Sequence, residues 1–181
     1  MTVTGQIWEV IEWLLNWPTR IGLILRAAVY SRALRKAPFS FSRRTIIKWY
    51  RHVRITAPWK MEVGAGTSIE RGNLFMSAGG ITLGRDVLIA PHCKLITHQH
   101  TFAELDRAIY DQPMEHGQII IEDGVWLGTG TIVLPGVRIG KGAVVGAGSV
   151  VTKSVPAFEI WVGNPARKIN DRRTSGKRPM P

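Results

Sequence analysis

The stretch IEDGVW-LGTGTI-VLPGVR-IGKGAV-VGAGSV-VTKSVP, residues 121–156, decides the fold. Every six-residue unit begins with a large aliphatic residue, and the first five units carry glycine at position four. A six-residue period fits neither an α-helix nor a single alternating strand, so it indicates a repeat too short to bury its own apolar side chain. Burial must therefore come from stacking one unit on another.

Each position of the unit has a predicted place. The first residue points inward, and glycine at position four supplies a left-handed turn dihedral that a Cβ would oppose. The fifth residue, which is small or β-branched, fills a corner; these residues are Val125, Thr131, Val137, Ala143, Ser149 and Val155. The pattern predicts a solenoid of short parallel strands about 4.8 Å apart.

The same pattern occurs earlier in the chain, from Val63 to Ile96, with two interruptions. Two surplus residues between Ile69 and Leu83 predict a bulge or a short excursion of the chain near Ser77–Gly80. Residues 97–118 carry no repeat, which predicts a loop that leaves the coil and returns. Functional loops on solenoids gather on one face, and this loop holds three of the five histidines: His98, His100 and His116.

The chain is predicted to form one β domain, residues 53–171, with a basic, amphipathic helical appendage at 1–52 and a disordered basic tail at 172–181. Residues 1–60 contain eleven Lys or Arg but only two acids, Glu9 and Glu12, so the basicity belongs to the appendage. The single cysteine, Cys93, excludes an intramolecular disulfide and is expected to pack in a corner.

Two roles are open for the appendage. Charged residues and Pro18 interrupt its apolar runs, which argues against a transmembrane span, and no basic segment precedes the apolar part as in a signal peptide. Its helices are expected either to lie in the surface of an anionic membrane, with Trp8, Trp13 and Trp17 at headgroup depth, or to cap the open end of the solenoid. We therefore expect a cytoplasmic protein, peripheral at the inner face of the membrane if the first role holds.

Three motifs together resemble one protein family. The hexads, the loop THQHTFAELDR (97–107) and the segment VGNPARKI (162–169) are similar to the hexapeptide-repeat acyltransferases, in particular to the branch of maltose, galactoside and exopolysaccharide O-acetyltransferases. The resemblance covers roughly residues 63–169. It implies a mainly β fold, a left-handed parallel β-helix of three hexads per coil, with one extruded catalytic loop. It further implies a homotrimer with active sites between subunits.

The resemblance also implies a reaction, the transfer of an acetyl group from acetyl-CoA to a sugar hydroxyl. It places the catalytic base on His100, and an imidazole suits this role because it titrates near neutrality. His98 is a candidate substrate contact, and Asn73 and Arg85 are candidates on earlier coils. A membrane-seeking appendage favours a glycan acceptor, in polysaccharide or lipid-linked glycan biosynthesis.

The donor contacts are carried over from the family in the same way. Thr129 and Ala147 are expected to line the pantetheine arm through backbone groups. Thr152, Lys153 and Arg167 are expected near the CoA phosphates, and charge–phosphate pairing fits the two cations. A family arginine falls on Asn170 here, so Lys168 or Arg172 is expected to complete the pocket. Trp126 is expected to cover the donor slot or to pack against a neighbour.

Two alternatives remain open at this stage. The γ-class carbonic anhydrases share such a solenoid and bind zinc through three histidines, which His98, His100 and His116 would supply, although the His-x-His spacing differs. A non-catalytic scaffold would keep the hexads but would not need His100, Lys153 and Arg167 together. No recognition motif accompanies the positive charge, so nucleic acid is not expected as a partner, and no metal is expected in the acyltransferase interpretation.

Overall fold

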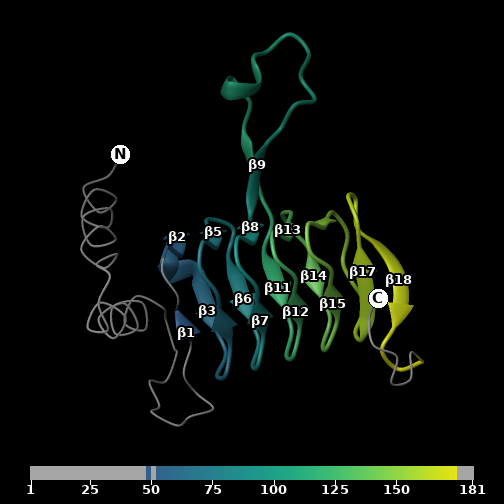
Figure 1. The fold of residues 1–181 in the computed structure, drawn as a ribbon. Helices are drawn as coiled ribbons and strands as arrows, with labels where there is room; N and C mark the ends of the chain where they lie inside the picture. The colour runs from purple at the N-terminus through teal and green to yellow at the C-terminus, as the bar shows by residue number, and fades with distance from the viewer. Residues whose placement is uncertain (1–47, 50–51, 175–181) are drawn as a thin grey trace.

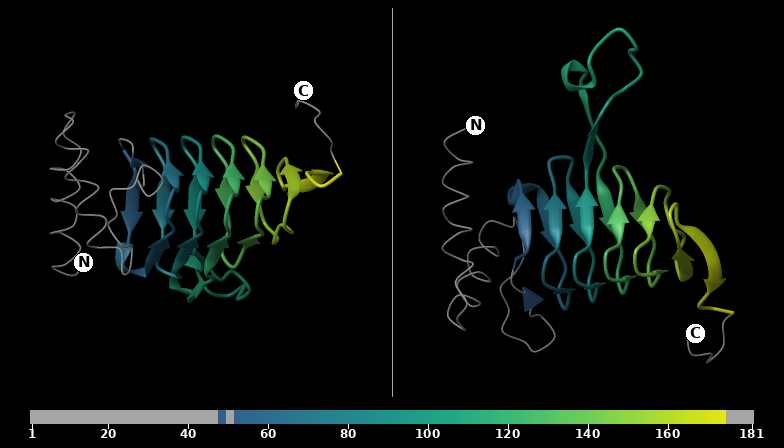
Figure 2. Two further views of the ribbon diagram at one scale, coloured as in Figure 1. Left: turned by 90° about the horizontal axis from the view of Figure 1, so that it is seen from below. Right: turned by 45° about the horizontal axis from the view of Figure 1, so that its top comes forward.

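The computed structural model describes residues 48–49 and 52–174. Three parallel sheets run along the axis of one solenoid and form its three sides (Figures 1 and 2). The predicted helices of the appendage, the membrane or capping role of residues 1–36, and all but residues 172–174 of the predicted disordered tail at 172–181 lie outside the described residues. Within the described part of the chain, no helix is both long enough and apolar enough to cross a membrane.

The sheets consist of short strands, in register from coil to coil. Sheet A contains β1 (Lys48–Trp49), β4 (Ser68–Ile69), β7 (Leu88–Ile89), β12 (Trp126–Leu127), β15 (Val144–Val145), β17 (Glu159–Val162) and β18 (Arg167–Asp171). Sheet B contains β2 (Arg54–Thr56), β5 (Leu74–Met76), β8 (Lys94–Ile96), β13 (Ile132–Val133) and β16 (Val150–Val151). Sheet C contains β3 (Met61–Val63), β6 (Ile81–Leu83), β11 (Ile119–Ile121) and β14 (Arg138–Ile139).

The predicted place of each repeat position is confirmed. The first residues of the six units, from Ile121 to Val151, are at most 1% exposed, and the fifth residues at most 3%. The glycines at position four have φ between 64° and 78°. Stacking of these units buries one continuous apolar core, and the described strands of each coil pair with those of the adjacent coils.

Of the two predicted forms, a bulge or a short excursion near Ser77–Gly80, the ladders contain no bulge, and residues 78–79 form a turn between β5 and β6. The surplus residues lengthen the flanking strands, because β5 and β6 each have three residues where β13 and β14 have two. Ile81, at the start of β6, is in register with Met61 in the coil before and Ile119 in the coil after. All three are fully buried, so the longer strands stack as well as the short ones.

The chain closes the solenoid with an antiparallel strand. β18 pairs with β17, and the ammonium of Lys168 on β18 lies 2.6 Å from a carboxylate oxygen of Glu159 on β17. Asp171, at the end of β18, pairs with Lys168 and Arg173. β18 thereby covers β17 and becomes the edge strand of sheet A, and charged residues such as Lys168 and Asp171 make that edge a poor partner for another strand.

Candidate active site

A hairpin projects from the corner between sheets B and C, as predicted for the loop at 97–118 (Figure 1). β9 (His98–His100) pairs antiparallel with β10 (Met114–His116), and the turn beyond them contains the 3₁₀ helix η2 (Ile109–Asp111). A second 3₁₀ helix, η1 (Pro58–Lys60), occupies the same corner in the first coil. The hairpin is the only insertion between strands of the described coils that pairs with itself.

The base of the hairpin is fixed to the solenoid by Thr97. Its side chain is fully buried, donates to the carbonyl of Met76 at 2.5 Å and accepts from the amide of Gly79 at 2.7 Å. Its carbonyl accepts from the amide of Gly117 at 2.8 Å where the hairpin returns. A Cβ added to Gly117 would collide with the backbone of Gly136 in the next coil, so the return path requires glycine.

The three predicted histidines lie on one side of this hairpin. His98 and His100 are two residues apart on β9, and His116 is the register partner of His98. The His98 and His116 ring centroids are 5.8 Å apart. Burial, followed by repulsion from His116 and His100, lowers the pKa of His98 below its ordinary value. His98 is therefore neutral at neutral pH and adds no charge beside His100.

His100 is half-buried and packs against Tyr110 in η2, with ring centroids 6.5 Å apart and planes inclined by 27°. Its Nδ1 is buried and has no hydrogen-bond partner among the described residues. Within the same part of the chain, no three His, Cys, Asp or Glu side chains are grouped so that they could hold a metal ion. The zinc alternative receives no support from this geometry.

The predicted donor contacts fall into two groups. Thr152 and Lys153 follow β16 and are exposed at the B–C corner, the corner that carries the hairpin two coils away. Thr129 and Ala147 are stacked at the A–B corner, where the amide of Gly148 donates to the Thr129 carbonyl at 2.8 Å. Arg167 begins β18 beside the same A–B corner, next to Ala166, whose amide donates to the carbonyl of Val150.

The other predicted site residues are not brought to His100. Asn73 is only 1% exposed; its side-chain Nδ2 donates to the Glu70 carbonyl at 2.6 Å, and its Oδ1 accepts from the backbone amide of Cys93 at 2.7 Å. This geometry favours a corner-bracing role for Asn73 over contact with an acceptor. Arg85 is exposed at the C–A corner, a different corner from the hairpin.

Three further predictions concern residues at corners and at the end of the chain. Lys168 is paired with Glu159 and Asp171, and Arg172 donates to the Gly142 carbonyl, so both cations have partners within the chain. Cys93 is fully buried in a corner, as predicted, and burial raises the pKa of its thiol to about 11. It is therefore a packing residue rather than a nucleophile.

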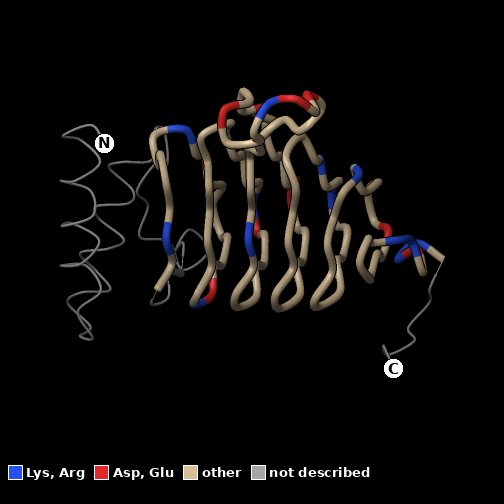
Figure 3. Tube along the Cα trace, turned by 90° about the horizontal axis from the view of Figure 1, so that it is seen from above, with Lys and Arg blue, Asp and Glu red and all other residues tan. Residues whose placement is uncertain are grey.

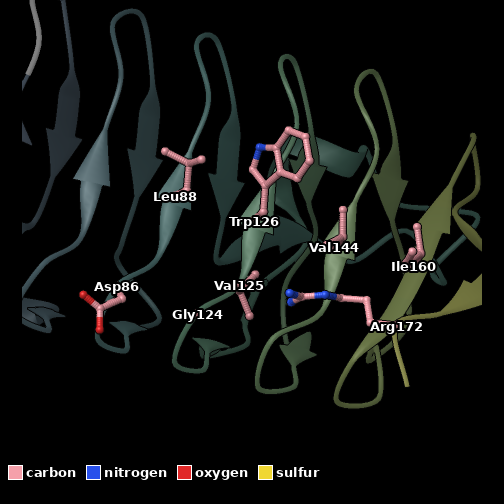
Figure 4. A pocket seen from close by; sticks show the side chains of 8 residues that line it. All are labelled: Asp86, Leu88, Gly124, Val125, Trp126, Val144, Ile160 and Arg172. Carbon is pink, nitrogen blue, oxygen red and sulfur yellow. The ribbon is translucent and has the colours of Figure 1, made fainter. Parts of the chain in front are cut away.

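A groove on sheet A, with a volume of about 410 Å³, was not predicted (Figure 4). Its floor is an outward row of apolar residues in register: Leu88, Trp126, Val144 and Ile160. Trp126 is 40% exposed there. This exposure is compatible with both roles expected for it, covering the donor slot or packing against a neighbour. The sequence signal was available, because every third unit contributes its last residue to this row.

Known proteins share this sequence pattern and fold. Residues 118–153 match the family model described as bacterial transferase hexapeptide (six repeats). A Schizosaccharomyces pombe protein that is named as an acetyltransferase is 45% identical to this chain over 96 residues, which cover 52% of this chain and 45% of the S. pombe protein. The Escherichia coli protein named as colanic acid biosynthesis acetyltransferase WcaF is 38% identical over 120 residues, covering 66% and 63%. The chain thus spans about half to two thirds of the length of these relatives.

Solved structures agree over most of the chain. A maltose O-acetyltransferase from Clostridium difficile superposes with a TM-score of 0.78 at 25% identity, covering 92% of this chain and 84% of that one. A hexapeptide-repeat acetyltransferase from Vibrio cholerae, complexed with acetyl-CoA, has the same TM-score at 24% identity, covering 90% and 84%. These matches confirm the predicted left-handed parallel β-helix. In its repeats, fold and relatives, the chain is similar to the hexapeptide-repeat acyltransferases, and residues 118–153 match the family model itself.

Proposed function

We propose that this chain transfers an acetyl group from acetyl-CoA to a hydroxyl of a sugar or glycan, with His100 as the general base. The observation that carries the proposal is the place of His100 on the extruded hairpin of the described coils, half-buried and with a buried ring nitrogen that, like that of His98, has no partner among the described residues. Structural histidines seldom leave a buried ring nitrogen unpaired, whereas functional sites tolerate this cost.

The chemistry needs one proton to move. His100 removes the proton of the acceptor hydroxyl as its oxygen attacks the thioester carbonyl of acetyl-CoA. The carbon–sulfur bond then breaks, the acetyl group remains on the sugar oxygen as an ester, and the imidazolium returns its proton to the CoA thiolate. His98, neutral beside His100, is a candidate contact for the acceptor in this proposal.

The separation of the donor residues into two groups supports a site shared between copies. Lys153 and Thr152 lie at the corner that carries His100, whereas Thr129, Ala147 and Arg167 lie at or beside the A–B corner. We propose that one acetyl-CoA contacts both groups by binding between two subunits. We propose a homotrimer, with a mass three times the 20.1 kDa of one chain. The exposed apolar groove on sheet A supports association of copies.

Acetyl transfer is tested by following release of the CoA thiol from acetyl-CoA with a panel of sugars and oligosaccharides. Acceptor-dependent release, together with acetyl ester on the product by mass spectrometry, is the expected result. Release that is the same with and without acceptor, or a product acetylated on an amine, would contradict the proposal. Acceptance of oligosaccharides over single sugars would favour polysaccharide modification, the role named for the E. coli relative.

The donor contacts are tested by single substitutions. Lys153→Ala or Arg167→Ala should raise KM for acetyl-CoA about tenfold, or roughly 1.4 kcal/mol, with little change in kcat, because a phosphate contact is equal in ground and transition states. Lys141→Ala is the matched control, since Lys141 is an exposed lysine at the C–A corner. Unchanged donor KM in both variants would place the CoA phosphates elsewhere.

The shared site is tested by mixing one chain that lacks the base with another that binds acetyl-CoA weakly. Co-expressed His100→Ala and Arg167→Ala chains should recover activity at low acetyl-CoA, because some subunit interfaces then hold an intact set of residues. A trimer by light scattering that shows no such recovery would place the site within one chain. A monomer would contradict the assembly altogether.

We further propose a cytoplasmic location at an anionic membrane surface for the full chain, on the charge of residues 1–60. The full chain should sediment with vesicles containing anionic lipid and be released by salt, with about 1 kcal/mol from each basic residue near the surface. Neutralising Arg20, Arg26, Arg32, Arg35 and Lys36 should abolish binding. Full-length protein that ignores such vesicles would favour the capping role.

A further inference from the structure

Tyr110 supplies the ring that lies against the imidazole of His100. The two residues are ten positions apart, and the hairpin brings them together because η2 follows the turn beyond β9. Their centroids are 6.5 Å apart at 27° between planes, within the range of offset-stacked aromatic pairs. Tyr110 is nevertheless 86% exposed, so burial of its own side chain does not explain where it lies.

Among the described residues, His100 has no hydrogen bond that would fix its ring. Its buried Nδ1 has no partner among the described residues, whereas catalytic histidines are commonly oriented by a bond from one ring nitrogen. Contact with Tyr110 is the ring contact available to hold the imidazole. With Nδ1 buried, Nε2 is the nitrogen left to face an acceptor hydroxyl.

Gln112 determines the shape of the turn that carries Tyr110. It is 4% exposed, and it is the one buried residue between Thr101 and His116, all of which the structure describes. Its Oε1 accepts from the amide of Glu104 at 3.2 Å, and its Nε2 donates to the carbonyls of Glu104 and Arg107 at 2.8 and 3.0 Å. The backbone amides of Asp111 and Gln112 close η2 on Ala108 and Ile109.

We propose that Tyr110 is a positioning residue that holds the His100 imidazole by ring stacking, and that Gln112 braces the turn from which Tyr110 reaches it. This inference rests on the proposed role of His100 as general base. It explains why a buried glutamine with three hydrogen bonds lies in an otherwise exposed hairpin. The hydroxyl of Tyr110 is not required, because stacking uses the ring alone.

Kinetics give the first arm of the test. Tyr110→Ala should lower kcat about 10²-fold, the effect expected when a reacting group moves by roughly 1 Å, with KM for acetyl-CoA unchanged. Tyr110→Phe keeps the ring and should keep kcat. Ile109→Ala removes a similar exposed apolar side chain from the same helix and should also keep kcat. A Tyr110→Ala enzyme with wild-type kcat would overturn the proposal.

Nuclear magnetic resonance of the histidine rings gives an arm that does not depend on turnover. The His100 signal, identified by its loss in His100→Asn, should shift in Tyr110→Ala, because the ring current of Tyr110 is removed, and stay in place in Tyr110→Phe and Ile109→Ala. If wild type transfers no acetyl group, the function fails while this shift still tests the stacking. A lowered kcat with an unmoved His100 signal would overturn the proposal, since Tyr110 would then act on the acceptor.

The role of Gln112 is tested by coupling. Gln112→Ala should lower kcat and move the His100 signal in the same direction as Tyr110→Ala. The double variant should lose little more than Tyr110→Ala alone, because both changes break one arrangement. Effects on kcat that multiply would show that Gln112 acts independently of Tyr110, and would overturn that half of the proposal.

Discussion

The solenoid and the hairpin of this chain obey different rules. In the solenoid, inward residues such as Leu127 are fully buried, and each backbone strand is bonded to the coils on both sides. In the hairpin, Leu105 is 95% exposed, and Gln112 alone is buried between Thr101 and His116. The hairpin also carries Glu104, Asp106, Asp111 and Glu115 against Arg107, so it is acidic in a basic chain (Figure 3).

The difference shows how a repeat protein can separate stability from chemistry. Stacked coils stabilise one another through nearest-neighbour contacts, so a residue in the core affects the whole array. The hairpin contributes little apolar burial and is free to present polar and aromatic side chains. Substitutions in one region should therefore change melting, and substitutions in the other should change turnover.

The largest expected effect is on turnover in the hairpin. His100→Ala should lower kcat by about 10²–10⁴-fold, because the proton transfer is lost while the scaffold and the donor contacts remain. The melting temperature and KM for acetyl-CoA should stay at wild-type values. Steady-state kinetics and a melting curve on the same preparation decide the matter. A variant with near wild-type kcat would remove His100 as the base.

Next in size is a matched pair of leucines. Leu127→Ala should lower the free energy of unfolding by about 2–5 kcal/mol, because it leaves a cavity in a fully buried stack. Leu105→Ala, in the exposed hairpin, should change it by less than about 0.5 kcal/mol. Denaturant titration of the two variants measures the difference. Equal losses would mean that the hairpin takes part in the stability of the assembly.

The repeat made most of the solenoid predictable. Ile121 and Val133 could be assigned to the core because each repeat position meets the same surroundings in every coil. The same rule covers Asn73, the fifth residue of the unit IERGNL, yet it was predicted as an acceptor contact. Its buried hydrogen bonds are those of a corner residue, so the repeat position was the better guide there.

The hairpin was predictable only as an interruption. The resemblance indicated His100, and the absence of hexads indicated residues 97–118. Nothing in the sequence placed Tyr110 against His100 or Gln112 inside the turn, because such contacts depend on the path of a non-repeating loop. The lengthened strands β5 and β6 were missed for a related reason, since a count of surplus residues does not tell a bulge from a longer ladder.

A smaller effect is expected where the two regions meet. Gly117→Ala should destabilise the fold by about 1–3 kcal/mol, because its Cβ would press on the backbone of Gly136. It should also lower kcat by shifting the base of the hairpin. Gly124→Ala is the control for melting, since open space surrounds its Cβ and only the φ of +66° opposes it, at about 1 kcal/mol. Unchanged melting and kcat in Gly117→Ala would show that the junction is pliable.

The smallest effect concerns the end of the solenoid far from the hairpin. The hydrogen bond from Lys168 holds the pKa of Glu159 below its usual value, and the hydrogen bonds from Arg173 do the same to Asp171. A lowered folded-state pKa gives stability that is complete above the unfolded value, about 4, and is lost as pH falls through the folded one. The pKa of Lys168 is raised, so its contribution to stability has the opposite pH dependence. That contribution is complete below about pH 10.4 and is lost at higher pH.

Melting curves from pH 7 to pH 3 test this pairing. The melting temperature of wild type should exceed that of Glu159→Gln at neutral pH, and the gap should narrow as the pH falls below about 4. In a Lys168→Met background, the melting temperatures with Glu159 and with Glu159→Gln should differ less even at neutral pH, because the partner of the carboxylate has been removed. Since Lys168 is half-exposed, salt should also reduce the gap. A gap independent of pH would mean that β18 is held to β17 by its backbone ladder alone, and that the charges closing sheet A contribute nothing to the fold.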